Sequence, residues 1–341
     1  EIYTPPSRHR DVYKRQRLGR IGTVTDFSTL AGRPTKITAR GFGWTHAGRT
    51  QPALADIDLV IEPGERVLLC GDSGSGKSTF LAAIAGVLGS DEEGTRTGEI
   101  LLEDSTGAVE EPGHSIPVGL VLQDPDSQVI SARVGDDIAF GCENLAYPRE
   151  EIWRRVAAAK DLVGPFVDMD FPTERLSGGQ KQRLALAGVI AMGAGVVLLD
   201  EPTANLDPAG ARDVVRAVSA LVEETGATLV VVEHQHTAWE GLLDRAVEIA
   251  HGRIVADGPF EQIARRRRVE ELPQARELGD GAAREGDAAL WSKDLVTRFG
   301  PPRTISLPAG ASTVITGPNG AGKSTWLMTM AGLLPAIFGE I

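Results

Sequence analysis

A glycine-rich phosphate-binding loop occurs twice in this chain and constrains its fold more than any other feature. The first copy reads GDSGSGKST from Gly71 to Thr79, and the second reads GPNGAGKST from Gly317 to Thr325. Each copy follows a short apolar segment, RVLLC or STVIT, and leads through an Ala- and Leu-rich segment to Gly-Glu-Ile. Since a strand, a glycine-rich turn and a helix form one phosphate-binding unit, we expect an α/β domain followed by the start of a second copy.

The repeat predicts the domain organisation. Residues 36–264 form one complete domain with a helical subdomain at about 124–192, residues 265–289 form a linker, and residues 290–341 form the first part of a second domain. We expect residues 1–35 to be a disordered or non-native tail. Because so little follows the second loop, we expect the chain to be a C-terminally truncated fragment. The arginines at 265–268 are flanked by glutamates and are predicted to form a solvated helix face.

Composition excludes several classes of protein. The 341 residues carry a formal net charge of −12, which argues against a broad surface for nucleic acid. The two cysteines, Cys70 and Cys142, are too few for a disulfide framework or a zinc site. No apolar run approaches the roughly 18 residues of a membrane helix, so another chain must cross the membrane if the function involves one.

The first loop is predicted to hold the phosphates of a nucleotide. Its glycines let backbone N–H groups turn inward, and the helix that follows adds its positive end. Lys77 can reach the β- and γ-phosphates, and Ser78 can offer a hydroxyl to Mg²⁺. Asp72 would repel phosphate unless its side chain points away. The predicted binding residues of this loop are Gly71, Asp72, Ser73, Gly74, Ser75, Gly76, Lys77, Ser78 and Thr79.

Two acids follow an apolar segment later in the chain. Residues 196–199 are all Val or Leu and predict a strand buried on both faces of a parallel sheet. Asp200 and Glu201 would then lie at the carboxyl edge of the sheet, where such folds bind ligands. We expect Asp200 to hold Mg²⁺, and Glu201 to polarise the water that attacks the γ-phosphate.

The string LSGGQ is the most discriminating motif. Ser177 and Gln180 form a capping box at the start of a helix. Gly178 and Gly179 leave the helix N-terminus open, so that an anion can approach its N–H groups.

Together these motifs resemble the ATP-binding cassette (ABC) ATPases over about residues 36–341. The resemblance implies a P-loop NTPase fold, with a mixed β-sheet core, covering helices and a helical signature subdomain. It also implies that the nucleotide is ATP with Mg²⁺. By the same resemblance, Trp44 stacks on adenine, Gln123 senses Mg²⁺ and the membrane partner, and His234 contacts the γ-phosphate.

The segment after Gln123, QDPDSQVISARVGDDIAFGCENLAYPREEI, is similar to energy-coupling-factor (ECF) ATPases, which also occur as tandem cassettes. Cys142 stands where proline is common in that group. The similarity implies an ATP-hydrolysing subunit at the cytoplasmic face of the membrane that powers uptake of a vitamin or of cobalt or nickel. Its partners would be an ECF transmembrane scaffold and a substrate-binding component, and no nucleic acid is expected.

Family members pair two cassettes, so that each ATP lies between one phosphate loop and the other cassette's LSGGQ. The residues expected to contact ATP across that interface are Ser177, Gly178, Gly179, Gln180 and Asp207. Those expected to bind ATP in the second copy are Phe299, Gly317, Asn319, Gly320, Gly322, Lys323, Ser324 and Thr325. Neither site is complete within this chain, so we expect it to be poorly active alone.

Three alternatives remain at this stage. A soluble ABC protein acting on ribosomes or DNA would carry a long charged arm, a coiled-coil insertion or zinc-binding cysteines, which this sequence lacks. Another class of ABC transporter ATPase would share the motifs of the first domain. A non-hydrolysing regulatory cassette is disfavoured in the first domain by Glu201 and His234.

Overall fold

The computed structural model describes most of the first domain and parts of the second. The described residues are 30, 32–89, 93–164, 167–204, 206–234, 236–271, 288–297, 301–308, 310, 313–315, 317 and 321–341. Residues 1–29, most of the predicted linker, and the predicted site residues Phe299, Asn319 and Gly320 lie outside them.

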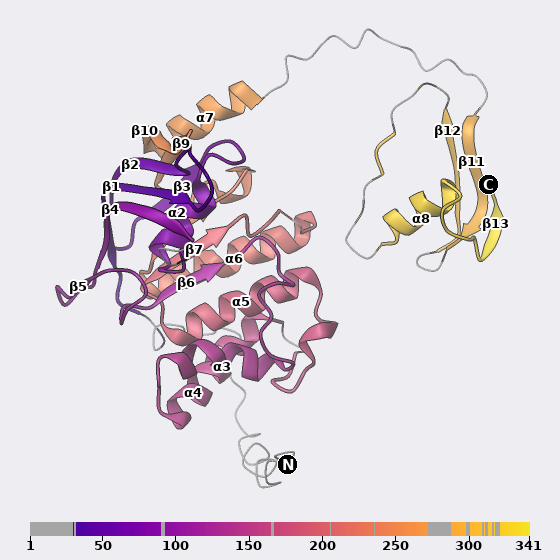
Figure 1. The fold of residues 1–341 in the computed structure, drawn as a ribbon. Helices are drawn as coiled ribbons and strands as arrows, with labels where there is room; N and C mark the ends of the chain where they lie inside the picture. The colour runs from indigo at the N-terminus through magenta and orange to yellow at the C-terminus, as the bar shows by residue number, and fades with distance from the viewer. Residues whose placement is uncertain are drawn as a thin grey trace.

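An antiparallel sheet forms one layer of the first domain (Figure 1). Its strands, in the order β2-β1-β4-β5, are Leu54–Ile61, Lys36–His46, Gly94–Glu103 and Val109–Glu110. Along β2 the apolar residues Leu54, Ile57, Leu59 and Ile61 are buried, while the residues between them are more exposed. This alternation arises because one face of the sheet packs on the core and the other faces solvent.

A six-stranded sheet carries the phosphate loop and the two acids. Its strands, in the order β10-β9-β3-β8-β7-β6, are Arg253–Pro259, Arg245–Ala250, Arg66–Cys70, Thr228–Val232, Val196–Asp200 and Val118–Val121. Strands β9, β3, β8, β7 and β6 run parallel, and only β10 is antiparallel to its neighbour. The carboxyl ends of β3 and β7 therefore lie at the same edge, with β8 between them.

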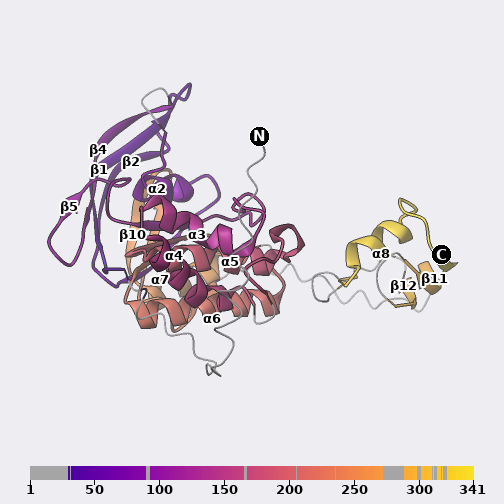
Figure 2. The same ribbon diagram turned by 90° about the horizontal axis from the view of Figure 1, so that it is seen from below.

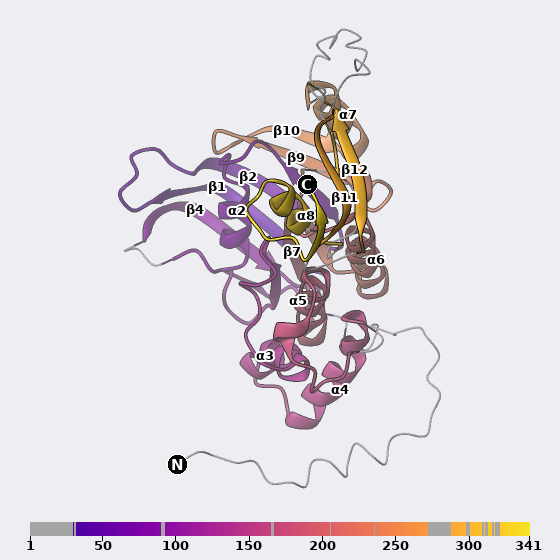
Figure 3. The ribbon, with the colours of Figure 1, turned by 90° about the vertical axis from the view of Figure 1, so that its right-hand side faces the viewer.

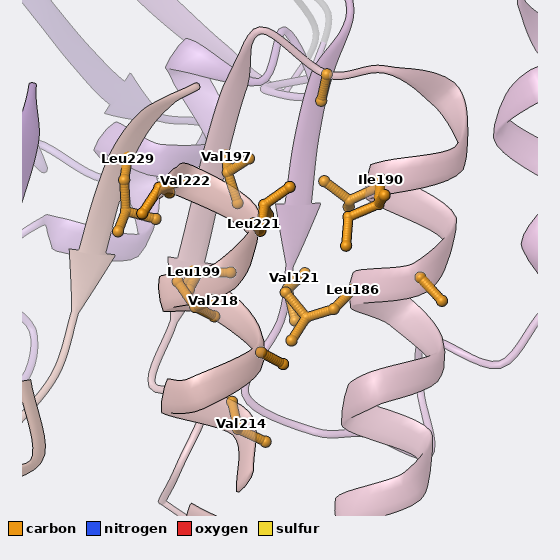
Figure 4. Close-up of a cluster of buried hydrophobic side chains, with 14 of the residues drawn as sticks. Val121, Leu186, Ile190, Val197, Leu199, Val214, Val218, Leu221, Val222 and Leu229 are labelled. Carbon is orange, nitrogen blue, oxygen red and sulfur yellow. The ribbon is translucent and has the colours of Figure 1, made fainter. Parts of the chain in front are cut away.

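Both faces of this sheet are buried, which explains the unbroken apolar run of β7. Val196 and Leu198 pack in a cluster with β1, β2, β4 and α2 (Lys77–Ile84). Val197 and Leu199 pack on the other face, against α5 (Gly178–Met192) and α6 (Pro208–Thr225), as Figure 4 shows. The predicted strand buried on both faces is confirmed. Figure 2 shows the layers from another side, with β1, β2 and β4 opposite α6.

Helices complete the first domain. Helices α3 (Val134–Asn144) and α4 (Arg149–Ala159) pack with α5 in the helical part of the chain. Figures 1 and 3 place α3 and α4 at the end of the domain away from the antiparallel sheet. Short 3₁₀ segments cover Lys160–Leu162, Thr173–Arg175 and His236–Trp239. The last described element before the second copy is α7 (Phe260–Glu271).

The C-terminal unit, residues 288–341, repeats the opening of the first domain. Strands β12 (Arg303–Pro308), β11 (Ala288–Val296) and β13 (Phe338–Glu340) form a sheet in that order, and α8 spans Lys323–Met330. Both α8 and α2 begin at the lysine of their loop, after a glycine with positive φ. A small core of Leu295, Trp326 and Met330 holds this unit together, and Leu333 and Phe338 are exposed.

Candidate active site

The phosphate loop connects the end of β3 to the start of α2, and its shape requires glycine. Gly71 has φ 144°, and a Cβ there would lie 2.1 Å from the carbonyl oxygen of Ile249. Gly76 has φ 110°, and a Cβ there would lie 2.6 Å from the carbonyl oxygen of Ala53. A side chain at either position would strain the backbone and collide with neighbouring main chain.

Lys77 lies across this loop. Its Nζ donates hydrogen bonds of 2.8 Å to the carbonyl oxygens of Gly71 and Asp72, and the residue is only 6% exposed. Burial lowers the pKa of Lys77, and the nearby carboxylates of Glu201 and Asp200 oppose that shift. A bound phosphate would add the negative charge that a buried ammonium favours.

The phosphate loop fits a phosphate group in a second respect. The hydroxyl oxygen of Ser75 is buried and has no hydrogen-bond partner among the described residues. Because buried polar atoms are normally paired, this loop has spare hydrogen-bonding capacity beside Lys77.

Asp200 ends β7 next to the start of α2. The hydroxyl of Ser78 hydrogen-bonds to its carboxylate, which favours the charged form, but burial and the charge of Glu201 raise the pKa of Asp200 overall. The described residues contain no group of three or more His, Cys, Asp or Glu side chains that could hold a metal alone. Magnesium commonly binds one or two carboxylates together with substrate phosphates, so Ser78 and Asp200 fit Mg²⁺ bound with a nucleotide.

Glu201 is held between two of the other predicted site residues. Its carboxylate accepts a 2.9 Å hydrogen bond from Nε2 of Gln123, and Nε2 of His234 lies 3.1 Å from its second oxygen. The backbone of Glu201 has φ 47°, a strained conformation for a residue with a Cβ, of the kind that concentrates at functional sites.

Glu233 supports this arrangement and was not identified from the sequence. It is buried, and it accepts hydrogen bonds of 2.6 Å from the Thr203 hydroxyl and 2.9 Å from the backbone N–H of His234. It therefore joins the segment after Glu201 to the end of β8. The one feature of the sequence that could have identified Glu233 is its position directly before His234.

A cleft of about 630 Å³ opens beside the loop. It is lined by His46, Arg49, Thr50, Gln51, Pro52, Ala53, Ser73, Gly74, Gly76, Lys77, Ser78, Thr79 and Glu201. The segment from His46 to Ala53 was not identified from the sequence, because a polar connection between two strands has no distinctive spacing.

Trp44 does not line this cleft. The residue is 4% exposed and packs in the core beneath the antiparallel sheet, and its indole N–H donates a 3.1 Å hydrogen bond to Nδ1 of His46. His46 lies two residues further along the same face of β1, and it is His46 that reaches the cleft. Stacking of Trp44 on adenine stays a prediction.

The signature residues lie at the start of α5, away from the residues that line the cleft. Ser177 and Gln180 form the capping box expected from the sequence. Added Cβ atoms at Gly178 and Gly179 would meet only side-chain atoms at 3.7 to 4.0 Å, so the helix N-terminus is open. Asp207 caps α6 through the N–H groups of Ala209 and Gly210.

The second loop repeats one feature of the first. Nζ of Lys323 donates a 2.7 Å hydrogen bond to the carbonyl oxygen of Gly317, matching the contact of Lys77 with Gly71. Gly322 precedes α8, whose first turn holds Lys323, Ser324 and Thr325.

One expectation is wrong. Among the arginines at 265–268, Arg267 is buried rather than solvated, because its guanidinium pairs with Glu248 on β9 and with Asp72 in the phosphate loop. Asp72 itself is exposed and turns its carboxylate to that arginine.

These features define a P-loop ATPase domain, with a phosphate loop and an acid-ended strand at one sheet edge and a signature helix, α5, packed on one face of that sheet. The sequence matches the model of the ABC transporter family over residues 54–204 and 302–341, more than half of the chain. The chain belongs to the ABC transporter family, whose ATPase domains bind ATP, and the prediction from its motifs is confirmed.

Three relatives show which members of the family this chain is similar to. The energy-coupling factor transporter ATP-binding protein EcfA1 of Caldanaerobacter subterraneus is 36% identical, over 70% of this chain and 86% of the relative. An ABC transporter ATP-binding protein of Methanosarcina mazei is 31% identical over 90% of this chain and 62% of the relative. Another, of Methanosarcina acetivorans, is 39% identical, and this chain spans 35% of its length. The chain therefore covers less than two thirds of both Methanosarcina relatives.

Two solved structures share the fold. The structure of cbiO1 from Clostridium perfringens, part of the ABC transporter complex cbiONQ, is 30% identical with a TM-score of 0.58, covering 68% of this chain and 92% of that one. The ATP-binding cassette MJ0796 has a TM-score of 0.54 at 22% identity, covering 65% of this chain and 98% of that one, and shows the fold alone. Among the described residues, no helix has the length and apolar character needed to cross a membrane.

Replacing Asp200 by Asn should stabilise the nucleotide-free protein while impairing Mg²⁺-dependent ATP hydrolysis. The raised pKa of Asp200 means that folding disfavours its charged form, so removing the charge should raise Tm by about 2 °C at pH 7. The gain should shrink as pH falls through the raised pKa toward the ordinary value of 3.8, because wild-type Asp200 then becomes neutral as well. Thermal denaturation across this pH range measures the effect.

The exposed carboxylate of Asp168 provides the control. Asp168→Asn should move Tm by less than about 0.5 °C. A lower Tm for Asp200→Asn than for the wild type at pH 7 would contradict the account.

Proposed function

We propose that this chain is an ATP-binding and ATP-hydrolysing subunit that powers a membrane importer of the ECF type. The observation that carries the hydrolytic assignment is the position of Glu201 between Gln123 and His234, at the sheet edge where Lys77 crosses the phosphate loop. This arrangement combines a carboxylate for proton transfer with groups that orient it.

In the proposed reaction, water attacks the γ-phosphorus of ATP, and the bond between that phosphorus and the oxygen bridging it to the β-phosphate breaks. Glu201 accepts a proton from that water, and ADP leaves with the bonding electron pair, giving ADP and phosphate. Lys77 and the N–H groups of the loop offset charge on the phosphate oxygens. His234 orients Glu201 and, by family resemblance, contacts the γ-phosphate. Mg²⁺, which Ser78, Asp200 and Gln123 would hold, would neutralise further phosphate charge.

We further propose that each ATP is shared between two cassettes. The signature residues Ser177 to Gln180 would serve the phosphate loop of a paired cassette, because they do not line the cleft of their own domain. The open helix N-terminus at Gly178 and Gly179 suits a γ-phosphate that approaches from outside the domain.

The importer assignment rests on sequence similarity. One relative is an ECF transporter ATPase, and a similar structure belongs to the cbiONQ transporter complex. The partners would be a transmembrane scaffold and a substrate-binding component, with the chain peripheral at the cytoplasmic face of the membrane. The cargo class would be a vitamin or a cobalt or nickel ion.

Replacing Glu201 by Gln should keep ATP binding and abolish turnover in the protein paired with its partner cassette. The amide preserves the shape of the side chain but cannot take the proton from water, so the rate of phosphate release should fall by at least about 100-fold. Phosphate release and retention of radiolabelled ATP measure the two effects.

Glu99→Gln is the matched control, because Glu99 lies on β4 and pairs with Arg40 at the surface. It should leave turnover unchanged. Turnover near the wild-type rate in Glu201→Gln would remove Glu201 from the role of general base.

Proteoliposomes that contain an ECF transmembrane scaffold and a substrate-binding component, together with the ATPase, test the importer assignment. We expect ATP-dependent accumulation of a vitamin, cobalt or nickel that is lost with Glu201→Gln. Active ATP hydrolysis with no uptake of these cargoes, together with salt-sensitive binding to ribosomes or DNA, would favour the soluble alternative instead.

A further inference from the structure

Asp72 introduces a carboxylate into a loop that must receive phosphate, and the structure pairs it with an arginine from a distant helix. Nη2 of Arg267 on α7 lies 3.1 Å from the Asp72 carboxylate, and its other terminal nitrogen lies 2.8 Å from Glu248 on β9. The phosphate loop, strand β9 and α7 therefore meet at one guanidinium group.

The environments of these charges differ. The side chain of Asp72 is 93% exposed, whereas the side chains of Arg267 and Glu248 are only 10% and 11% exposed. Arg266 also contacts Glu248. In the buried part of the cluster, Arg266 and Arg267 both pair with Glu248. Arg267 also pairs with Asp72 and so connects this buried part to the phosphate loop.

Asp72 also holds Lys77. Its carbonyl oxygen accepts a hydrogen bond from Lys77 Nζ, while its carboxylate binds Arg267. Arg267 thus fixes the residue whose main chain positions the phosphate-binding lysine, and its positive charge offsets the only carboxylate within the loop itself.

We propose that Arg267 is a positioning residue for nucleotide binding: it draws the Asp72 carboxylate to α7 and neutralises it, so that the loop can accept an anionic nucleotide. The proposal depends on ATP binding at this loop and is independent of transport.

A purely structural role for Arg267, exerted through Glu248, predicts different behaviour. Loss of the Glu248 contact would lower Tm whether or not Asp72 is charged. Loss of the Asp72 contact would weaken ATP binding only while Asp72 carries its charge. A double-mutant cycle between the two positions separates these effects.

The experiment is calorimetric titration of the full chain with Mg-ATP. Arg267→Met should weaken ATP binding about fivefold in the wild-type background, because an uncompensated carboxylate then faces the phosphates. In the Asp72→Asn background the same change should weaken binding by less than about twofold. Arg267→Lys, which keeps the positive charge that offsets Asp72 and guards against a folding failure of Arg267→Met, should lose less affinity than Arg267→Met.

Arg265→Met is the matched control, because the Arg265 side chain is 81% exposed and pairs only at 3.8 Å with Glu261 of its own helix among the described contacts. It should leave the affinity unchanged. Equal losses for Arg267→Met in both backgrounds, no loss in the wild-type background, or an equal loss for Arg265→Met would each overturn the proposal.

Discussion

The burial of the parallel strands β3, β8 and β7 on both faces is the constraint on which the site depends. Because their side chains pack into two separate cores, these strands cannot slide or rotate without exposing apolar surface. Their register therefore fixes where each strand ends. The phosphate loop follows β3, Asp200 and Glu201 follow β7, and His234 follows β8, so the fold brings three distant segments to one edge.

The site concentrates charges that are costly to bury. Burial lowers the pKa of Lys77 and raises the pKa of Asp200, so each group is less favourable in its charged form than it would be in water. Each partly compensates the other, and Ser78 supports Asp200 through a hydrogen bond. A nucleotide carrying Mg²⁺ would supply both missing charges, since its phosphates complement the lysine and its cation complements the carboxylate. The site therefore disfavours the charged forms of Lys77 and Asp200 while it is empty, and it favours a ligand that brings the opposite charges.

Local sequence patterns predicted the parts of this structure that are set by neighbouring residues. The apolar run before Asp200 predicted a doubly buried strand, and the spacing of Ser177 and Gln180 predicted a capping box; both are observed. Gln123 and His234 were assigned from family resemblance, whereas Glu201 was expected from its place after the apolar strand, and the structure brings Glu201 into contact with both of the others.

Contacts between residues far apart in sequence could not be predicted in the same way. The pairing of Asp72 with Arg267 depends on the packing of α7 against β9, and no local pattern distinguishes Arg267 from the other arginines of its run. The support of Glu233 by Thr203 likewise depends on where β7 and β8 end. The position of Trp44 follows from strand periodicity, which puts Trp44 and His46 on the same face of β1, but only the three-dimensional arrangement shows which of the two reaches the cleft.

The central claim is that the first loop is an ATP site built around Lys77. Titration of the full chain with Mg-ATP, compared with the variant Lys77→Met, tests it most directly. We predict that the wild-type chain binds Mg-ATP and that the variant binds at least about tenfold more weakly, since it loses the buried ammonium group that faces the phosphates. Equal affinities for the two proteins would contradict the account, because the loop would then not be where the nucleotide binds.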